Sequence, residues 1–174
     1  VSHDIEEVSQ LADHLLLLQD GRLKEQGSLL ALSSRLDTRL AHEEQAAAIL
    51  LGTITAQDEA FALTEMSVEG QTVQVNQLAL PVGTQRRLRI PARDVSICLE
   101  QPPQTSILNI LPVTIAEIEA SDGARLLLRL ALGEQYLLAR ITRKSAERLG
   151  LTVGHRVFAQ IKSVALLSEA GDTI

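Results

Sequence analysis

Two short segments of the sequence are rich in hydrogen-bond donors and contain no carboxylate. The first holds Thr105, Ser106 and Asn109, and the second holds Lys162 and Ser163. A tetrahedral dianion needs several N–H and O–H donors converging at about 2.7 to 3.1 Å, with a cation to compensate its charge. The two segments supply hydroxyl, carboxamide and ammonium groups of this kind, so they are candidates for an oxyanion site if the fold brings them together.

Each of these residues also has an ordinary structural interpretation. Lysine is common on strand edges, where its charge discourages pairing with other chains, and Lys162 with Ser163 could serve only that purpose. Ser106 and Asn109 are residue types that form turns at the start of a strand. These alternatives stay open at the level of the residues alone.

The elements that carry the two segments have the pattern of short strands, and the same unit occurs twice. Leu80-Pro-Val-Gly83 parallels Leu151-Thr-Val-Gly154, and Asp94-Val-Ser-Ile97 parallels Ser163-Val-Ala-Leu166, with a spacing that differs by two residues. Such short alternating strands with turn residues between them are typical of a sandwich or a small, partly open barrel. Arg93 falls opposite Lys162 and is a weaker candidate for a pseudo-equivalent site, although Asp94 beside it opposes an anion. The remaining weaker candidates are Ser96 and Thr142.

The first 48 residues have a different pattern. Asp4 and Glu7 resemble a capping box, which predicts a short helix after residue 4. An Asp20-Gly21 pair between two strand-like runs predicts a hairpin over 14–26. Gly27 and Ser28 then precede a stretch with a helical apolar stripe, so a second helix is predicted over 29–48. The chain begins without methionine and almost at a helix cap, and we expect it to be part of a longer protein.

Composition excludes several classes of function. The formal net charge is −6, the basic residues are scattered, and aromatic residues make up 2% of the chain. A nucleic-acid binder needs clustered cations and stacking platforms, so neither DNA nor RNA is an expected partner. The single cysteine, Cys98, permits no intramolecular disulfide and no cysteine-based zinc site, which is typical of a reducing cytoplasm, and no metal site is predicted.

The beginning of the chain resembles the end of an ATPase domain of ABC transporters. The resemblance rests on Ser2-His3-Asp4, Glu6-Glu7, Ala12-Asp13, Asp20-Gly21-Arg22 and Gly27. It implies that His3 is the switch histidine, which contacts the γ-phosphate and the catalytic water in that family. A surface histidine near a helix cap is the structural alternative. No GxxxxGK[ST] phosphate-binding loop is present, so this chain alone is not expected to hydrolyse ATP, and ATP with Mg²⁺ would belong to the parent subunit.

The β region resembles the molybdate-binding (Mop) domain, also called TOBE, of molybdate-importer ATPases. The matching segments are Thr105-Ser106-Ile-Leu-Asn109, Leu130-Ala-Leu-Gly133, Ala139-Arg-Ile-Thr142 and Ala159-Gln-Ile-Lys162-Ser163-Val164. Members of the family set the Ser-x-x-Asn segment of one barrel against the Lys-Ser segment of another. Many of them have arginine before the asparagine, where this chain has Leu108, so one possible cation is absent.

The combined resemblance predicts a mainly β chain with two tandem OB-like Mop/TOBE repeats after a short α/β tail of an ABC ATPase domain. The expected division is 1–48 for the tail, 49–100 for the first repeat and 104–170 for the Mop domain. The implied function is regulatory binding of molybdate or tungstate. The alternative is a dimerisation or regulatory-protein module of an importer for another substrate. The resemblance also implies a homodimer, a membrane permease as partner, and a cytoplasmic position at the inner membrane.

Overall fold

The structure is a computed structural model that describes residues 8–9, 12–38 and 44–167. His3 and the predicted capping box therefore lie outside the described residues, although Val8 and Ser9 are helical. A hairpin of β1 (His14–Gln19) and β2 (Arg22–Ser28) follows. Asp20 and Gly21 have φ values of 51° and 71°, the positive pair that a tight two-residue turn requires, so the hairpin prediction is confirmed.

The helix predicted over 29–48 is confirmed only for residues 29–33 and is wrong for the other described residues, 34–38 and 44–48. Helix α2 spans only Leu29–Ser33, capped by the Ser28 hydroxyl, which accepts a hydrogen bond from the Ala31 N–H at 3.2 Å. The hydroxyl of Ser34 donates to the main-chain oxygen of Ala31 at 3.3 Å, and Thr38 donates likewise to Arg35 at 3.0 Å. Such local side-chain bonds compete with helix propagation, so the helix ends at Ser33 although the apolar stripe continues in the sequence.

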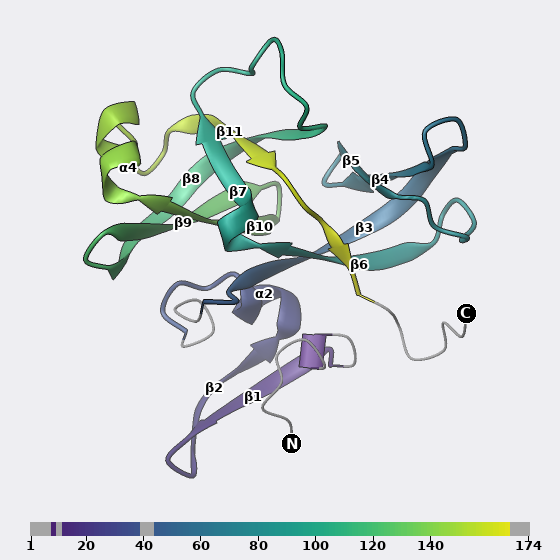
Figure 1. The fold of residues 1–174 in the computed structure, drawn as a ribbon. Coiled ribbons are helices and arrows are strands. Elements are labelled where there is room, and N and C mark those ends of the chain that lie inside the picture. Colours follow the sequence, from purple (N-terminus) through teal and green to yellow (C-terminus); the bar gives the residue numbers. More distant parts are fainter. Residues whose placement is uncertain (1–7, 10–11, 39–43, 168–174) are drawn as a thin grey trace.

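Two five-stranded antiparallel sheets form most of the remaining described chain (Figure 1). The first has the order β12-β6-β3-β4-β5 and the second the order β10-β9-β8-β11-β7. The mainly β fold with two OB-like repeats is thus confirmed. The strands of the first repeat are β3 (Ala47–Asp58), β4 (Leu63–Val68), β5 (Gln71–Asn76), β6 (Gln85–Pro91) and β7 (Val95–Cys98). Those of the second are β8 (Asn109–Asp122), β9 (Arg125–Leu132), β10 (Gln135–Thr142), β11 (Arg156–Ile161) and β12 (Ala165–Leu166).

Equivalent hydrogen bonds show that the two repeats have the same construction. The Gly83 N–H donates to Ile54 O at 2.8 Å, and the Gly154 N–H donates to Ile115 O at 2.8 Å. Both glycines have a φ of 90°, a conformation that favours glycine. The second repeat differs by helix α4 (Arg143–Leu149), which starts at the Thr142 cap and ends at Gly150.

The repeats exchange their last strands. β7 of the first repeat pairs with β11, in register Ile161↔Val95, and β12 of the second repeat pairs with β6, in register Leu166↔Leu88. Figure 1 shows the yellow C-terminal segment crossing from β11 to β6. Buried aliphatic side chains from both repeats form one core cluster, which includes Ile54, Met66, Leu88, Leu128 and Leu130. Neither repeat completes its sheet without the other.

The helices of the described ranges are all too short or too polar to cross a membrane.

Candidate functional site

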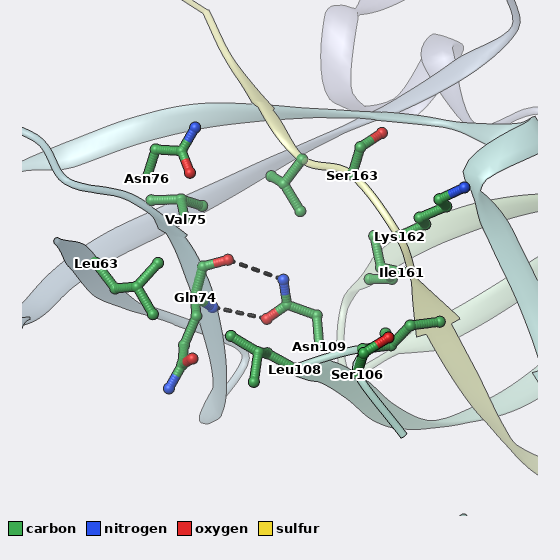
Figure 2. A pocket seen from close by; sticks show the side chains of 12 residues that line it. Leu63, Gln74, Val75, Asn76, Ser106, Leu108, Asn109, Ile161, Lys162 and Ser163 are labelled. Atoms are coloured by element: carbon green, nitrogen blue, oxygen red, sulfur yellow. Dashed lines mark hydrogen bonds between the residues drawn. The ribbon is translucent and has the colours of Figure 1, made fainter. Parts of the chain in front are cut away.

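One cavity, of about 630 Å³, lies where the repeats meet (Figure 2). Four segments surround it: the start of β4, the outer strand β5, the residues that lead into β8, and the residues that follow β11. Its lining mixes apolar side chains with hydroxyl, carboxamide and ammonium groups. The lining residues are Leu63, Gln74, Val75, Asn76, Ser106, Ile107, Leu108, Asn109, Ile161, Lys162, Ser163 and Val164.

The structure brings the two predicted donor segments together in this cavity. Ser106, Asn109, Lys162 and Ser163 all line it. The pairing of β8 with β11 explains the proximity, because Asn109 begins β8 and lies opposite Ile161, the residue before Lys162. A spacing of more than 50 residues in the sequence therefore becomes adjacency in the sheet.

Asn109 is largely committed to the fold. Its side chain is buried, with 8% exposed. The carboxamide oxygen accepts from the Gln74 N–H at 2.7 Å, and the carboxamide nitrogen donates to Gln74 O at 2.8 Å. Figure 2 shows both bonds, which join the second repeat to the edge of β5 in place of a further strand. A carboxamide carries two N–H groups, so one donor of Asn109 is left for a ligand.

Lys162 and Ser163 are exposed and follow the end of β11. Among the described residues, the Lys162 ammonium has no ion-pair partner, while its main-chain N–H donates to Asp94 O at 2.9 Å. Figure 2 shows the ammonium end directed away from Asn109. The Ser163 hydroxyl donates to the Asp94 carboxylate. The cation is therefore available, but it must swing inward to meet Ser106, and Ser163 must leave Asp94.

Sequence reasoning missed Asn76, the last residue of β5, whose exposed carboxamide lines the cavity. In an edge strand, alternate main-chain groups face away from the paired strand. Gln74 uses these outward groups to bind Asn109, and Asn76 is two residues further along, so its N–H faces the same way. The alternation of polar and apolar residues in Gln71–Asn76 does indicate a strand. No pattern in the sequence, however, places this strand beside the second repeat.

The other predicted site residues do not line the cavity. The hydroxyl of Thr105 accepts from the Ile107 N–H at 3.1 Å, and that of Thr142 accepts from the Ser145 N–H at 3.0 Å at the start of α4. Ser96 lies beside Gln160 on the paired strand at 3.5 Å, and Arg93 is exposed in η1 (Ala92–Asp94). These four residues are therefore not among the donors that line the cavity.

The position of the first repeat that corresponds to this donor set is filled by apolar side chains. Ile90 pairs with Ala48 as Ile161 pairs with Asn109, so Ala48 takes the place of the asparagine. Ala48 and Ala92 are fully buried in a cluster with Leu127 and Leu138. In the described part of the chain the polar donor set thus occurs once. That part also holds no group of three or more His, Cys, Asp or Glu side chains able to bind a metal ion.

Comparison with known proteins identifies the domain. Residues 105–167 match the TOBE domain family. The chain is 43% identical, over 96% of its length, to the molybdenum import ATP-binding protein ModC of Aromatoleum aromaticum, and 46% identical, over 96%, to ModC 2 of Azotobacter vinelandii. It spans 44% and 47% of the lengths of these relatives.

A solved structure has the same fold. It is the cytoplasmic molybdate-binding protein ModG with molybdate bound, with a TM-score of 0.58 and 24% identity, covering 68% of this chain and 93% of that one. At this identity the likeness concerns the arrangement of the strands and not the ligand.

Proposed function

We propose that this chain, a TOBE-domain member of the molybdenum import ATP-binding protein family, is a regulatory domain that binds a tetrahedral oxyanion, molybdate or tungstate, in the cavity between its repeats. The observation that carries the proposal is the convergence of Ser106, Asn109, Lys162 and Ser163 on one cavity. The names of the relatives make molybdate the first ligand to test.

The chemistry of the lining supports an anion more than a neutral ligand. Lys162 supplies a positive charge without a carboxylate partner among residues 8–9, 12–38 and 44–167. Ser106, Asn109 and Asn76 supply donors from both repeats. Because a dianion loses hydration water on entering, donors and a cation must replace those contacts. The volume exceeds that of a single tetrahedral anion, so we expect water molecules to remain with it or the lining to close around it.

The assignments that concern the whole longer protein are also proposals. They are ATP and Mg²⁺ binding by the parent subunit, a switch role for His3, a homodimer, a membrane permease as partner, and a cytoplasmic position at the inner membrane. The similarity to import ATP-binding proteins over 96% of the chain supports them. The chain contains no phosphate-binding loop, so an ATPase assay on this chain alone should give the background rate.

Calorimetric titration tests the anion-binding proposal. Molybdate and tungstate should bind the wild-type chain, and sulfate should bind more weakly, because its smaller tetrahedron cannot contact all donors of a site of fixed size. Lys162→Ala should weaken molybdate binding by about 30-fold or more, since it removes the charge compensation. Lys144→Ala is the matched control, because Lys144 is an exposed lysine on α4 outside the cavity lining.

Two results would contradict the proposal: failure of the wild-type chain to bind any of these anions, or equal affinities for Lys162→Ala and Lys144→Ala. In the first case the alternative, a module for dimerisation or protein interaction, would take its place.

A further inference from the structure

The donor segment after β11 is held by one acidic residue from the other repeat. Asp94 is the last residue of η1, directly before the exchanged strand β7. Its main-chain oxygen accepts from the Lys162 N–H at 2.9 Å, and its carboxylate accepts from the Ser163 hydroxyl. Both residues of the Lys-Ser pair are thus tied to Asp94, although Asp94 is not itself part of the cavity lining.

A hydroxyl has a single proton to donate. While Ser163 donates it to Asp94, Ser163 can only accept, and an oxyanion offers nothing for it to accept. An anion that is to receive a hydrogen bond from the Ser163 hydroxyl must therefore take that hydroxyl from the carboxylate. Among the described residues the Asp94 carboxylate has no other hydrogen-bond or ion-pair partner, so losing Ser163 leaves a half-buried charge without compensation.

The negative charge of Asp94 also disfavours binding of the anion. A carboxylate beside the site of a dianion repels it, and repulsion is least screened where the groups are partly withdrawn from water. Lys162 is bonded to Asp94 only through its main-chain N–H, so among the described residues its ammonium forms no ion pair that would neutralise this carboxylate.

We propose that Asp94 sets the affinity of the cavity for its anion, by competing for the Ser163 hydroxyl and by repelling the bound charge. This inference rests on the proposed function, because it concerns the same cavity. Asp94 is a residue that determines affinity from outside the lining, and its removal should tighten binding where the removal of a donor weakens it.

Two substitutions of Asp94 separate the charge from the hydrogen bond. Asp94→Asn removes the charge and keeps an acceptor for Ser163, and we expect it to lower the dissociation constant for molybdate about fivefold. Asp94→Ala also frees the hydroxyl, and we expect a decrease of about 20-fold. In a Ser163→Ala background the difference between these two variants should disappear. Glu147→Gln, at an exposed position on α4, is the control for net charge.

The outcomes separate this inference from the proposed function. If the wild-type chain binds molybdate and neither Asp94 variant binds it more tightly, the role of Asp94 is wrong while the site stands. If Glu147→Gln tightens binding as much as Asp94→Asn, the effect is one of net charge, and the inference is again overturned. If neither the wild type nor any Asp94 variant binds molybdate or tungstate, the proposed function itself fails. Thermal unfolding of each variant shows whether the fold is kept.

Discussion

Asn109 illustrates how one side chain serves the fold and the site at once. Its residue type and position predicted a donor to an anion. In the structure, its oxygen and one of its N–H groups bind the main chain of Gln74, and only the second N–H is left for a ligand. The donor chemistry was visible in the sequence. The competing partner was not, because Gln74 lies 35 residues away in another repeat.

Replacing Asn109 should therefore affect stability as well as binding. Asn109→Ala leaves the part-buried N–H and C=O of Gln74 without partners, so we expect the free energy of unfolding to fall by about 1 to 3 kcal/mol. Urea denaturation measures this change. Asn76→Ala is the matched control, since it removes an exposed carboxamide from the same cavity. Equal stability of the two variants would show that the Asn109 bonds do not hold the repeats together.

The other predicted site residues fall into two groups: those that line the cavity, and those whose hydroxyl groups bond the neighbouring main chain. Ser106 and Lys162 could be predicted because each belongs to a short segment with a recognisable pattern, and β8 and β11 are neighbours within one repeat. Thr105 and Thr142 have the right chemistry, but each bonds a main-chain N–H two or three residues away. Such local bonds are common for these residue types, so donor chemistry alone cannot separate a ligand from a cap.

At the scale of elements, the exchanged strand β12 links the cavity to the N-terminal hairpin. The chain passes from Lys162 and Ser163 into β12 and reaches Leu167, whose N–H donates to Arg87 O at 3.1 Å. Leu167 is buried against Leu15, Leu29, Leu32 and Ile49. The Arg87 guanidinium in turn donates to Ala12 O at 2.9 Å and pairs with Asp13. The site and the hairpin are thus joined by five residues of chain and one buried leucine.

Leu167→Ala should loosen this connection. Truncating a buried leucine leaves a cavity, and we expect a loss of about 2 to 5 kcal/mol of unfolding free energy. Hydrogen exchange should become faster in β1, β2 and α2 and remain slow in β8 and β9. Leu99→Ala, at a leucine that is 46% exposed, is the control and should change little. Unaltered exchange in the hairpin would mean that Leu167 does not hold it.

A second link joins the β4–β5 turn to the β9–β10 turn. The Glu69 carboxylate accepts from the Gln135 side chain at 3.0 Å and from the Glu134 N–H at 3.1 Å, and these bonds lower the pKa of Glu69. Gln135 also binds Leu51 N–H and O, at 2.7 and 3.0 Å. Besides the exchanged strands, the repeats are therefore also linked by side-chain hydrogen bonds at Asn109 and at Glu69 with Gln135.

The Glu69 bonds should make part of the stability depend on pH. Because the pKa is lower in the folded chain, the contribution is fully present above the unfolded value of 4.5 and is lost as the pH falls through the folded value. Glu69→Ala should therefore have a lower melting temperature than the wild type at pH 7. The difference between the two melting temperatures should disappear at acidic pH. Glu69 is exposed, so the effect is small. Glu134→Ala controls for the lost charge, and an equal gap at all pH values would contradict the assignment.

At the scale of the whole molecule, strand exchange makes the two repeats one unit, and in the part of the chain that the structure describes the polar donor set occurs once. The repeated sequence anchors predicted the duplication, and the strand pairings confirm it. The exchange was not predicted. A strand has the same alternation of residues in the sequence whether it pairs within its own repeat or with the other repeat. The division into residues 1–48, 49–100 and 104–170 stays a prediction, and β7 and β12 show that a cut between the repeats would separate each from its last strand.

A second site at Arg93, opposite Lys162 in the repeat, stays a prediction, and the residues at the corresponding place of the first repeat do not favour it. The backbone repeats, but Ala48 and Ala92 close the corresponding place in the first repeat with buried methyl groups. The main-chain hydrogen bonds of a duplicated fold can be present in both repeats while the side-chain donors for a ligand are present in only one. We therefore expect one oxyanion per chain.

The most direct test of this account is to locate the anion itself. Crystals of the chain grown with molybdate should show one anomalous scattering peak per chain at the molybdenum edge, in contact with Ser106 and with Lys162 swung inward. The same crystals of Lys162→Ala should show a weak peak or none there. A strong peak elsewhere on the chain, with the cavity between β5 and β11 empty of molybdenum, would contradict the central claim.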